Sequence, residues 1–332
     1  MKLAVIGAGA WGTALAVTLS AKYSVSLWSR SARHVSDLRR DDENKRYLPG
    51  IRFGGAVEVV DQIETAMQSA GLVLFAVPTA GLREVLRSAR DHMAGAGGIW
   101  VCKGFEPGSG KLPHEVAAEE FSPATLRGVL SGPSFAVDVA RGLPTAVTLA
   151  ASEEEFAITM ARRLHTGRFR VYSSTDLIGV EVGGAVKNVI AIAAGICDGL
   201  QLGDSARAAL VTRGLAEITR LGVRLGGRME TFMGLSGLGD LTLTCAGDLS
   251  RNRRVGLALA TGKRLTEILS ELGHVAEGVH TANEVLRLAN ELGVEMPITQ
   301  VVVSVLAGSV SPAEAVEALL HRDPKPESGA QV

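Results

Sequence analysis

A glycine-rich turn at the start of the chain limits the possible folds most strongly. The apolar run Leu3–Ile6 leads directly into GAGAWG at residues 7–12, and a helical pattern over Trp11–Lys22 follows. GxGxxG between a strand and a helix is typical of dinucleotide-binding domains. The first glycine permits the tight turn, the second lets a pyrophosphate approach the backbone, and the third lets the helix pack against the strand. We therefore predict a dinucleotide site at Gly7, Gly9 and Gly12, with the phosphates at the helix N-terminus.

The same residues superficially resemble a secretory signal peptide, because Met1-Lys2 precedes an apolar run. The three glycines break this run, which suits a strand, a turn and a helix better than a continuous apolar helix. No segment reaches the roughly 18 to 20 apolar residues of a membrane span. The longest candidate, Val189–Cys197, stops at Asp198. We expect a cytoplasmic protein without membrane insertion.

The charge balance argues against two classes of partner. The chain has 332 residues, with 34 Lys or Arg and 35 Asp or Glu, for a formal net charge of −1. This balance gives no general attraction to nucleic acid or to an anionic membrane, although a local basic site for a small anion is compatible with it. The cysteines Cys102, Cys197 and Cys245 are far apart and form no CxxC pair. We expect buried or incidental thiols in a reducing compartment and no metal site.

The first half of the chain alternates short apolar runs with helical patterns. Helices are predicted between several of the runs, as at Gly81–His92 and Glu153–Leu164. Apolar strands separated by helices favour a doubly wound, Rossmann-like α/β domain with a mainly parallel sheet. The predicted strands are Leu3–Ile6, Val25–Trp28, Val57–Val60, Leu72–Ala76, Ile99–Cys102, Gly128–Leu130, Ala146–Leu149 and Phe169–Tyr172.

The second half contains long helical patterns and predicts an all-α domain. One helix start is marked by Ser311 as the cap, proline in the first turn and Glu314 three residues on. We predict a dinucleotide-binding domain over 1–175, a helical substrate domain over 176–322 and a flexible tail over 323–332. The predicted helices are Asp176–Cys197, Ser205–Leu225, Ala282–Leu292 and Pro312–His321.

The end of the second predicted strand bears on the choice of cofactor. NAD-specific sites usually place Asp or Glu there to bind the ribose hydroxyls, and none occurs between Ser24 and His34. Arg30 and Arg33 could instead meet a 2′-phosphate. We predict that NADP(H) is accepted, with or without NAD(H). The alternative is that both arginines are simply solvated.

Two loops that follow predicted strands carry groups able to bind an anion or a carbonyl. Lys103 comes directly after the strand that ends at Cys102, and SGPSFA at residues 131–136 follows the next strand. In open α/β sheets ligands bind beyond the carboxyl ends of the strands. Lys103, Ser134 and the backbone N–H groups of this turn are therefore candidates for ligand contacts, although each could be an ordinary exposed loop residue.

Lys187 is the strongest candidate for a catalytic residue. It lies in the otherwise apolar helical pattern VGGAVKNVIAIAAGI, where a lysine is costly to bury unless it is paired or functional. Gly183, one turn earlier on the same face, would leave room for a ligand beside the ammonium group. Lys187 could then exchange a proton with an alcohol or carbonyl oxygen, and Asn188 could fix its orientation. The alternative is a lysine that extends to the surface.

Two later segments complete the candidate site. Asp240 in LGD could hold Lys187 by a charge-assisted hydrogen bond. In SRNRR at residues 250–254, Arg251 could bind a phosphate with its planar guanidinium group. A solvated basic turn is the alternative for this run.

With these residues in view, the chain resembles the bacterial type of NAD(P)-dependent glycerol-3-phosphate dehydrogenase over nearly its whole length, to about Ala307. The matching stretches are far more specific together than the glycine motif alone. They are GAGAWGTALA, NKRYLPG, VCKG, SGPSFA with GLPTA, EVGGAVKNVIAIAAGICDGL, AALVTRGLAEI, TFMGLSGLGDLTLTC, LSRNRRVG and VAEGVHTA.

The resemblance implies a reaction and a set of residue roles. Dihydroxyacetone phosphate would be interconverted with sn-glycerol 3-phosphate, which supplies phospholipid synthesis, and Lys187 would be the general acid or base. The substrate would contact Lys103, Gly132, Ser134, Lys187, Asn188, Asp240, Ser250, Arg251 and Asn252. The dinucleotide would contact Gly7, Gly9, Ala10, Trp11, Gly12, Arg30, Tyr47, Lys103, Ala136, Arg251, Val275 and Glu277.

Two other functions remain open at this point. A β-hydroxyacid dehydrogenase also joins a Rossmann domain to a helical domain with a lysine near glycines, but the SRN segment and Lys103 favour a phosphate-bearing substrate. A nicotinamide-binding sensor would need no lysine beside a helix glycine. The abundant apolar residues of the helical half are compatible with a homodimer.

Overall fold

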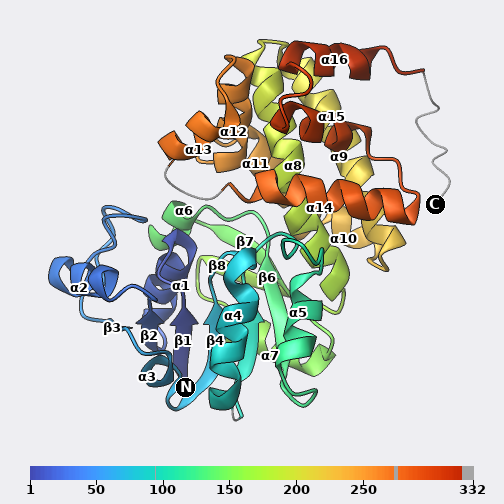
Figure 1. Cartoon of the computed structure of the whole chain (residues 1–332). Helices are drawn as coiled ribbons and strands as arrows, with labels where there is room; N and C mark the ends of the chain where they lie inside the picture. Colours follow the sequence, from blue (N-terminus) through green and yellow to red (C-terminus); the bar gives the residue numbers. More distant parts are fainter. Residues whose placement is uncertain (94, 273–275, 324–332) are drawn as a thin grey trace. The chain divides into compact units, whose positions relative to one another are not determined.

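The computed structural model describes residues 1–93, 95–272 and 276–323, and an eight-stranded sheet organises the first half of the chain (Figure 1). All eight predicted strands are confirmed, with ends that shift by at most a few residues. The strands are β1 (Lys2–Ile6), β2 (Ser24–Trp28), β3 (Val57–Val60), β4 (Ala70–Phe75), β5 (Gly97–Trp100), β6 (Arg127–Ser131), β7 (Thr145–Ala151) and β8 (Phe169–Ser174).

The strand order is β3-β2-β1-β4-β5-β6-β7-β8. Neighbouring strands from β3 to β6 pair in parallel, β6 and β7 pair antiparallel, and β7 and β8 are again parallel. The first six positions follow the strand order of dinucleotide-binding Rossmann domains, in which ligands bind at the carboxyl ends of the strands where the order reverses. The predicted mainly parallel, doubly wound sheet is confirmed.

Helices connect the strands as the alternating pattern predicted. Residues of β4 alternate between the two faces: Leu72 and Leu74 join a core cluster with α1 and α7, whereas the Phe75 ring lies 5.9 Å from that of Phe121, directly after α5. Helices therefore cover both faces. They are α1 (Ala10–Ser20), α2 (Ala32–Asp41), α3 (Ile63–Met67), α4 (Thr79–Ala89) with the 3₁₀ turn η1 (Arg90–His92), α5 (Pro113–Glu120), α6 (Ala136–Ala140) and α7 (Glu154–Leu164).

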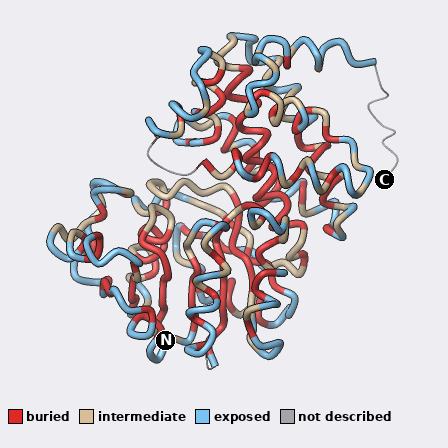
Figure 2. Tube along the Cα trace, in the orientation of Figure 1, coloured by how far each residue is buried: buried red, intermediate tan, exposed pale blue. Residues whose placement is uncertain are grey.

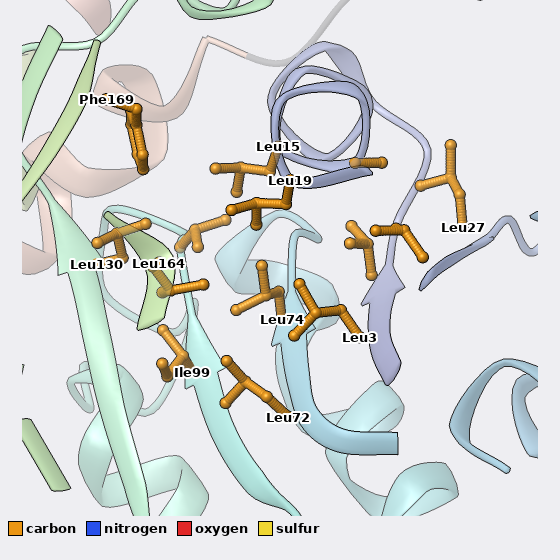
Figure 3. Close-up of a cluster of buried hydrophobic side chains, with 14 of the residues drawn as sticks. Leu3, Leu15, Leu19, Leu27, Leu72, Leu74, Ile99, Leu130, Leu164 and Phe169 are labelled. Carbon is orange, nitrogen blue, oxygen red and sulfur yellow. The ribbon is translucent and has the colours of Figure 1, made fainter. Parts of the chain in front are cut away.

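The core on one face of the sheet places the glycine-rich turn. Leu15 and Leu19 of α1 pack with Leu3 of β1 and with Leu74, and all four are fully buried (Figure 3). Burial of a leucine side chain contributes on the order of 2 kcal/mol. Since β1 and α1 share this core, the turn that joins them has little freedom to move.

The second half is helical, as predicted. The capping box at the start of α16 is confirmed, because Ser311 Oγ accepts from the Glu314 N–H and the Glu314 carboxylate accepts from the Ser311 N–H. The helices are α8 (Leu177–Gly199), α9 (Asp204–Arg224), α10 (Met229–Met233), the π-helical turn η2 (Leu235–Gly239), α11 (Asp240–Ala246), α12 (Arg251–Ala260), α13 (Leu265–Leu272), α14 (Glu277–Leu292), α15 (Pro297–Leu306) and α16 (Pro312–Leu320).

Helix α8 is the central element of the helical half. The expectation that no apolar segment reaches the length of a membrane span is wrong for α8. Within the described residues it is the one helix long and apolar enough to cross a membrane, but 89% of its apolar window is buried inside the protein. Every residue from Gly179 to Cys197 is buried. Buried residues, drawn in red, run through the interior of the helical half (Figure 2). This burial is that of a core helix enclosed by other helices.

The chain divides into two compact units, one made of residues 1–103 and 111–177, the other of residues 104–110 and 178 onward. Segment 104–110 groups with the helical unit because it binds α14: the Gly108 N–H donates to the Glu284 carboxylate at 2.9 Å. No sequence pattern pointed to this excursion of the chain. Of the tail expected at 323–332, all but Asp323 lies outside the described residues.

The three cysteines are buried and none belongs to a disulfide, which leads to a testable expectation. Burial raises the pKa of the Cys197 thiol, and it raises the pKa of Cys245 to about 12. Only the thiolate reacts with disulfide reagents. At pH 8 the native protein should therefore resist labelling by Ellman's reagent, whereas all three thiols should react within minutes in guanidinium chloride. Rapid labelling of the native protein would contradict the burial of these side chains.

Candidate functional site

The glycines of GAGAWG have three different surroundings. Gly7 has φ +122°, and a Cβ there would overlap the Ala76 carbonyl; a Cβ on Gly12 would overlap the Gly7 carbonyl. A Cβ on Gly9 would meet nothing within 4 Å. Gly7 and Gly12 therefore close the turn between strand and helix, whereas Gly9 borders open space. This is the arrangement that a dinucleotide pyrophosphate needs.

The start of α1 offers donors to such a group. Gly9 is the N-cap residue and supplies no side-chain acceptor, and the first turn of the helix contains no acidic residue. The N–H groups of the first turn lack partners within the helix, so they can bind an anion. Trp11, in the same turn, is half-buried and packs edge-on against the Phe169 ring at 6.4 Å.

The predicted cofactor residues after β2 lie at the surface. Arg30 and Arg33 are both exposed, and neither forms an ion pair or hydrogen bond with the residues that the structure describes. Tyr47 is half-buried, with its ring 5.3 Å from that of His34. Both arginines are thus available to a negatively charged ligand, and the structure is equally compatible with solvated side chains.

Lys103, Gly132 and Ser134 lie together beyond the carboxyl ends of β5 and β6. Lys103 Nζ donates to the Gly132 carbonyl at 3.1 Å, and Ser134 Oγ donates to the same oxygen at 3.0 Å. Gly132 has φ +138°, and a Cβ there would lie 3.0 Å from Val147 Cα, so this turn requires glycine. Ala136 begins α6, which packs against α1.

Lys187 is buried in α8 and paired, as its position in an apolar helix predicted. Its Nζ lies 2.6 Å from Asp240 Oδ1 and donates to Thr244 Oγ1 at 2.6 Å. The Lys187 and Asp240 side chains are 7% and 2% exposed, so the alternative of a lysine that extends to the surface is wrong. The carboxylate compensates the buried charge, and the proposed hydrogen bond between these two residues is confirmed.

Thr244 is a member of this cluster that the sequence did not single out. Its hydroxyl accepts from Lys187 and lies 2.6 Å from the Asp240 carbonyl, one turn earlier in α11. The signal was present in the spacing: residues four apart on a helix share a face, so a predicted role for Asp240 extends to Thr244.

The expectation that Gly183 leaves room for a ligand beside Lys187 is wrong. A Cβ there would lie 2.6 Å from the Ser236 carbonyl oxygen, in η2. The missing side chain therefore admits the backbone of another segment and leaves no room for a ligand. Turn η2 directly precedes Asp240, and π-helical turns often occur at functional sites. Gly183 thus helps to bring Asp240 close to Lys187.

Asn188 and Asn252 form a buried polar pair that joins three helices. Asn252 Nδ2 donates to Asn188 Oδ1 at 2.9 Å, and Asn252 Oδ1 accepts from the Gly278 N–H at the start of α14. Asn188 is 3% exposed, and its Nδ2 has no partner within the described chain. A buried amide donor without a partner is costly, so this group is a candidate for a ligand contact.

The basic segment SRNRR, residues 250–254, forms the start of helix α12. Ser250 is its N-cap, with Oγ accepting from the Arg253 N–H at 3.2 Å, and Arg253 is neutralised by Asp198 and Asp248. Arg251 is exposed and makes no ion pair among the described residues. A cation at the positive end of a helix is unfavourable unless an anion binds there.

The predicted site residues thus form clusters within each unit. Glu277 is the first residue of α14, in the helical unit with Lys187 and Arg251. Val275 lies outside the described residues. The glycine-rich turn and the Lys103 cluster belong to the sheet unit.

The family models and the similar sequences point to one family. Family models for the N-terminus and the C-terminus of NAD-dependent glycerol-3-phosphate dehydrogenase match residues 2–157 and 176–317. A relative from Nitrosospira multiformis, named glycerol-3-phosphate dehydrogenase (NAD(P)+), is 59% identical over 98% of this chain and 99% of its own. One from Dechloromonas aromatica with the same name is 58% identical over 98% of this chain and 99% of its own.

A solved structure supports the same assignment. The crystal structure of glycerol-3-phosphate dehydrogenase from Coxiella burnetii is 42% identical, with a TM-score of 0.93 over 97% of this chain and 99% of that one. Both halves of this sequence, the Rossmann-like sheet and the helical bundle, are covered by these matches. The chain therefore belongs to the NAD(P)-dependent glycerol-3-phosphate dehydrogenase family.

Proposed function

We propose that this enzyme reduces dihydroxyacetone phosphate to sn-glycerol 3-phosphate with NAD(P)H, in a reversible reaction. The observation that carries this function is the buried Lys187 ammonium group, held by Asp240 and Thr244 on a core helix. Reduction of a ketone requires a proton for the oxygen. A lysine fixed in this way is a suitable donor.

The roles of the other residues follow from their chemistry. When bound, the cofactor supplies a hydride to the central carbonyl carbon. Lys187 donates the proton to the carbonyl oxygen, and Asp240 and Thr244 hold Lys187 in one orientation. The unpartnered Nδ2 of Asn188 donates to a substrate oxygen. Burial limits the access of water to the ammonium group, which strengthens its interactions.

Positive groups hold the phosphate of the substrate. Arg251 lies at the start of α12, where the helix N-terminus and the guanidinium group both favour an anion. Ser250 and Asn252 flank it in the sequence and contribute to the same site. Lys103, with Gly132 and Ser134, provides further substrate contacts. Binding of the remote phosphate positions the reactive carbonyl.

The cofactor half of the site fits a dinucleotide, because Gly9 borders open space at an uncapped helix N-terminus. We assign Gly7, Gly9, Ala10, Trp11 and Gly12 to the pyrophosphate region. The other dinucleotide contacts are assigned to Arg30, Tyr47, Lys103, Ala136, Arg251, Val275 and Glu277.

Arg30 should favour NADPH over NADH. It is exposed at the end of β2 without an ion-pair partner in the described chain, so it can bind a 2′-phosphate. A charge-assisted hydrogen bond contributes about 1.5 kcal/mol, or about tenfold in affinity. Arg30→Ala should therefore lower the ratio of kcat/KM for NADPH to that for NADH about tenfold. An unchanged ratio would remove Arg30 from cofactor selection, and Arg39→Ala, further along α2, serves as the surface control.

The test of the reaction is NADPH oxidation, followed at 340 nm, with dihydroxyacetone phosphate as substrate. Turnover should be efficient with this substrate and absent with small β-keto acids, which a β-hydroxyacid dehydrogenase would reduce. Binding of NADPH without turnover of any of these compounds would instead indicate a cofactor sensor. Dihydroxyacetone without phosphate is the control for the phosphate site, and its kcat/KM should be lower by several orders of magnitude.

The cellular role follows from the product. We propose that the enzyme acts in the cytoplasm and supplies glycerol 3-phosphate to phospholipid synthesis. In this scheme residues 1–175 bind the cofactor and residues 176–322 supply the proton donor and phosphate contacts. A homodimer is compatible with the apolar residues of the helical half, and sedimentation of the purified enzyme tests it.

A further inference from the structure

Asn44, which follows α2, makes a buried polar contact with the glycine-rich turn that the proposed function does not use. Asn44 is fully buried, and its amide Nδ2 donates to the Ala8 carbonyl at 3.0 Å and to Thr13 Oγ1 at 2.7 Å. Ala8 lies between the two first glycines of the turn, and Thr13 lies in α1. One side chain from a distant loop therefore binds the turn and the helix that follows it.

The orientation of the Ala8 carbonyl sets the direction of the Gly9 N–H, which belongs to the same peptide group. In a trans peptide the C=O of one residue and the N–H of the next point in opposite directions, and the described chain contains no cis peptide. A carbonyl held towards Asn44 therefore directs the Gly9 N–H the opposite way. That N–H has no partner among the described residues, and Gly9 borders open space.

A second group supports the same carbonyl. His34 Nε2 lies 3.3 Å from the Ala8 oxygen, and the His34 ring packs edge-on against the Tyr47 ring. Asn44 also accepts from the Tyr47 N–H at 3.2 Å through its Oδ1. The Asn44 amide thus uses its oxygen to order its own loop and its nitrogen to order the glycine turn.

We propose that Asn44 is a positioning residue for the cofactor: by holding the Ala8 carbonyl, it keeps the Gly9 N–H directed at the dinucleotide pyrophosphate. The inference rests on the proposed function only in that the ligand is NAD(P)H. Asn44 itself touches no reacting atom. Its effect should therefore appear in binding of pyrophosphate-containing ligands and leave chemistry at saturating cofactor unchanged.

Three variants separate this role from simple stabilisation. Asn44→Ala removes all side-chain hydrogen bonds. Asn44→Ser keeps an acceptor for the Tyr47 N–H, as serine can bond to the N–H three residues on, but it is too short to reach Ala8. Leu48→Ala, in the same loop, removes a buried apolar side chain and no side-chain hydrogen bond, which makes it the control for lost stability.

The measurements are dissociation constants for ADP-ribose and for adenosine 2′-monophosphate, which lacks the pyrophosphate, together with steady-state kinetics and thermal unfolding. Both Asn44 variants should bind ADP-ribose about tenfold more weakly and adenosine 2′-monophosphate within twofold of wild type. The KM for NADPH should rise about tenfold with kcat within twofold. Leu48→Ala should lower the melting temperature without changing the affinity for ADP-ribose.

Three results would overturn the proposal: equal loss of affinity for both ligands, wild-type affinity for ADP-ribose in Asn44→Ala, or recovery of that affinity in Asn44→Ser. If Asn44→Ala does not fold, Asn44→Ser decides the question alone. A wild-type enzyme that fails to reduce dihydroxyacetone phosphate would refute the proposed function, yet the ADP-ribose measurements would still test Asn44.

Discussion

Replacing Lys187 by methionine should lower kcat by about 10³-fold to 10⁴-fold, the upper part of the range for loss of a general acid. Methionine keeps the length and the apolar stem of lysine but has no proton to donate. The affinity for NADPH, measured by fluorescence titration, should stay within about threefold of wild type. Full turnover in the variant would show that another group protonates the substrate.

Lys187→Met should also destabilise the protein, so the experiment needs a control variant that separates lost stability from lost catalysis. It leaves the Asp240 carboxylate, 2% exposed, without its counter-charge, and removal of one partner from a buried ion pair costs about 3–5 kcal/mol. The double variant Lys187→Met/Asp240→Asn removes both charges and should regain most of the lost stability while remaining inactive. If stability and turnover recover together, the loss in the single variant reflects misfolding alone.

Two substitutions of glycine by alanine in the glycine-rich turn should have opposite signatures. Gly12→Ala places a methyl group onto the Gly7 carbonyl, which is backbone and cannot move aside, so the free energy of unfolding should fall by about 3 kcal/mol or more. Gly9→Ala has room for its methyl group and a backbone angle, φ −77°, that alanine adopts without strain. Its stability should equal that of wild type or exceed it slightly.

The affinities should separate the two variants further. The methyl group of Gly9→Ala occupies the open space that we assign to the pyrophosphate, so the dissociation constant for NADPH should rise at least about tenfold, or 1.4 kcal/mol. Urea unfolding and NADPH titration of both proteins give the comparison. Tight NADPH binding by Gly9→Ala would move the pyrophosphate away from this turn.

The strands and long helices could be predicted because their local patterns agree with their packing. Apolar runs such as Leu72–Phe75 are buried on both faces, so they appear in the sequence as uninterrupted hydrophobic stretches. The grouping of residues 104–110 with the helical unit could not be predicted, since it rests on contacts with residues far along the chain, such as the hydrogen bond between Gly108 and Glu284.

For the candidate site, the sequence likewise predicted some contacts and missed others. A lysine in an apolar helix needs a partner, which made Asp240 a candidate, and the resemblance to a known family placed Asp240 in the same site. What fills the space beside Gly183 was not predictable, because a glycine on a helix face admits a ligand and a neighbouring backbone equally well. The sequence carries no sign that Ser236 takes that place, since the contact is made by its carbonyl oxygen, which every residue has.

Helix α8 has no solvent-facing side between Gly179 and Cys197. Ligand-binding segments of many proteins open locally at little cost in free energy, because few contacts hold them. A helix enclosed on all sides cannot open in this way without exposing the interior of its whole unit. Lys187 therefore loses its place only when the helical unit unfolds, so melting of that unit and loss of the proton donor become a single event.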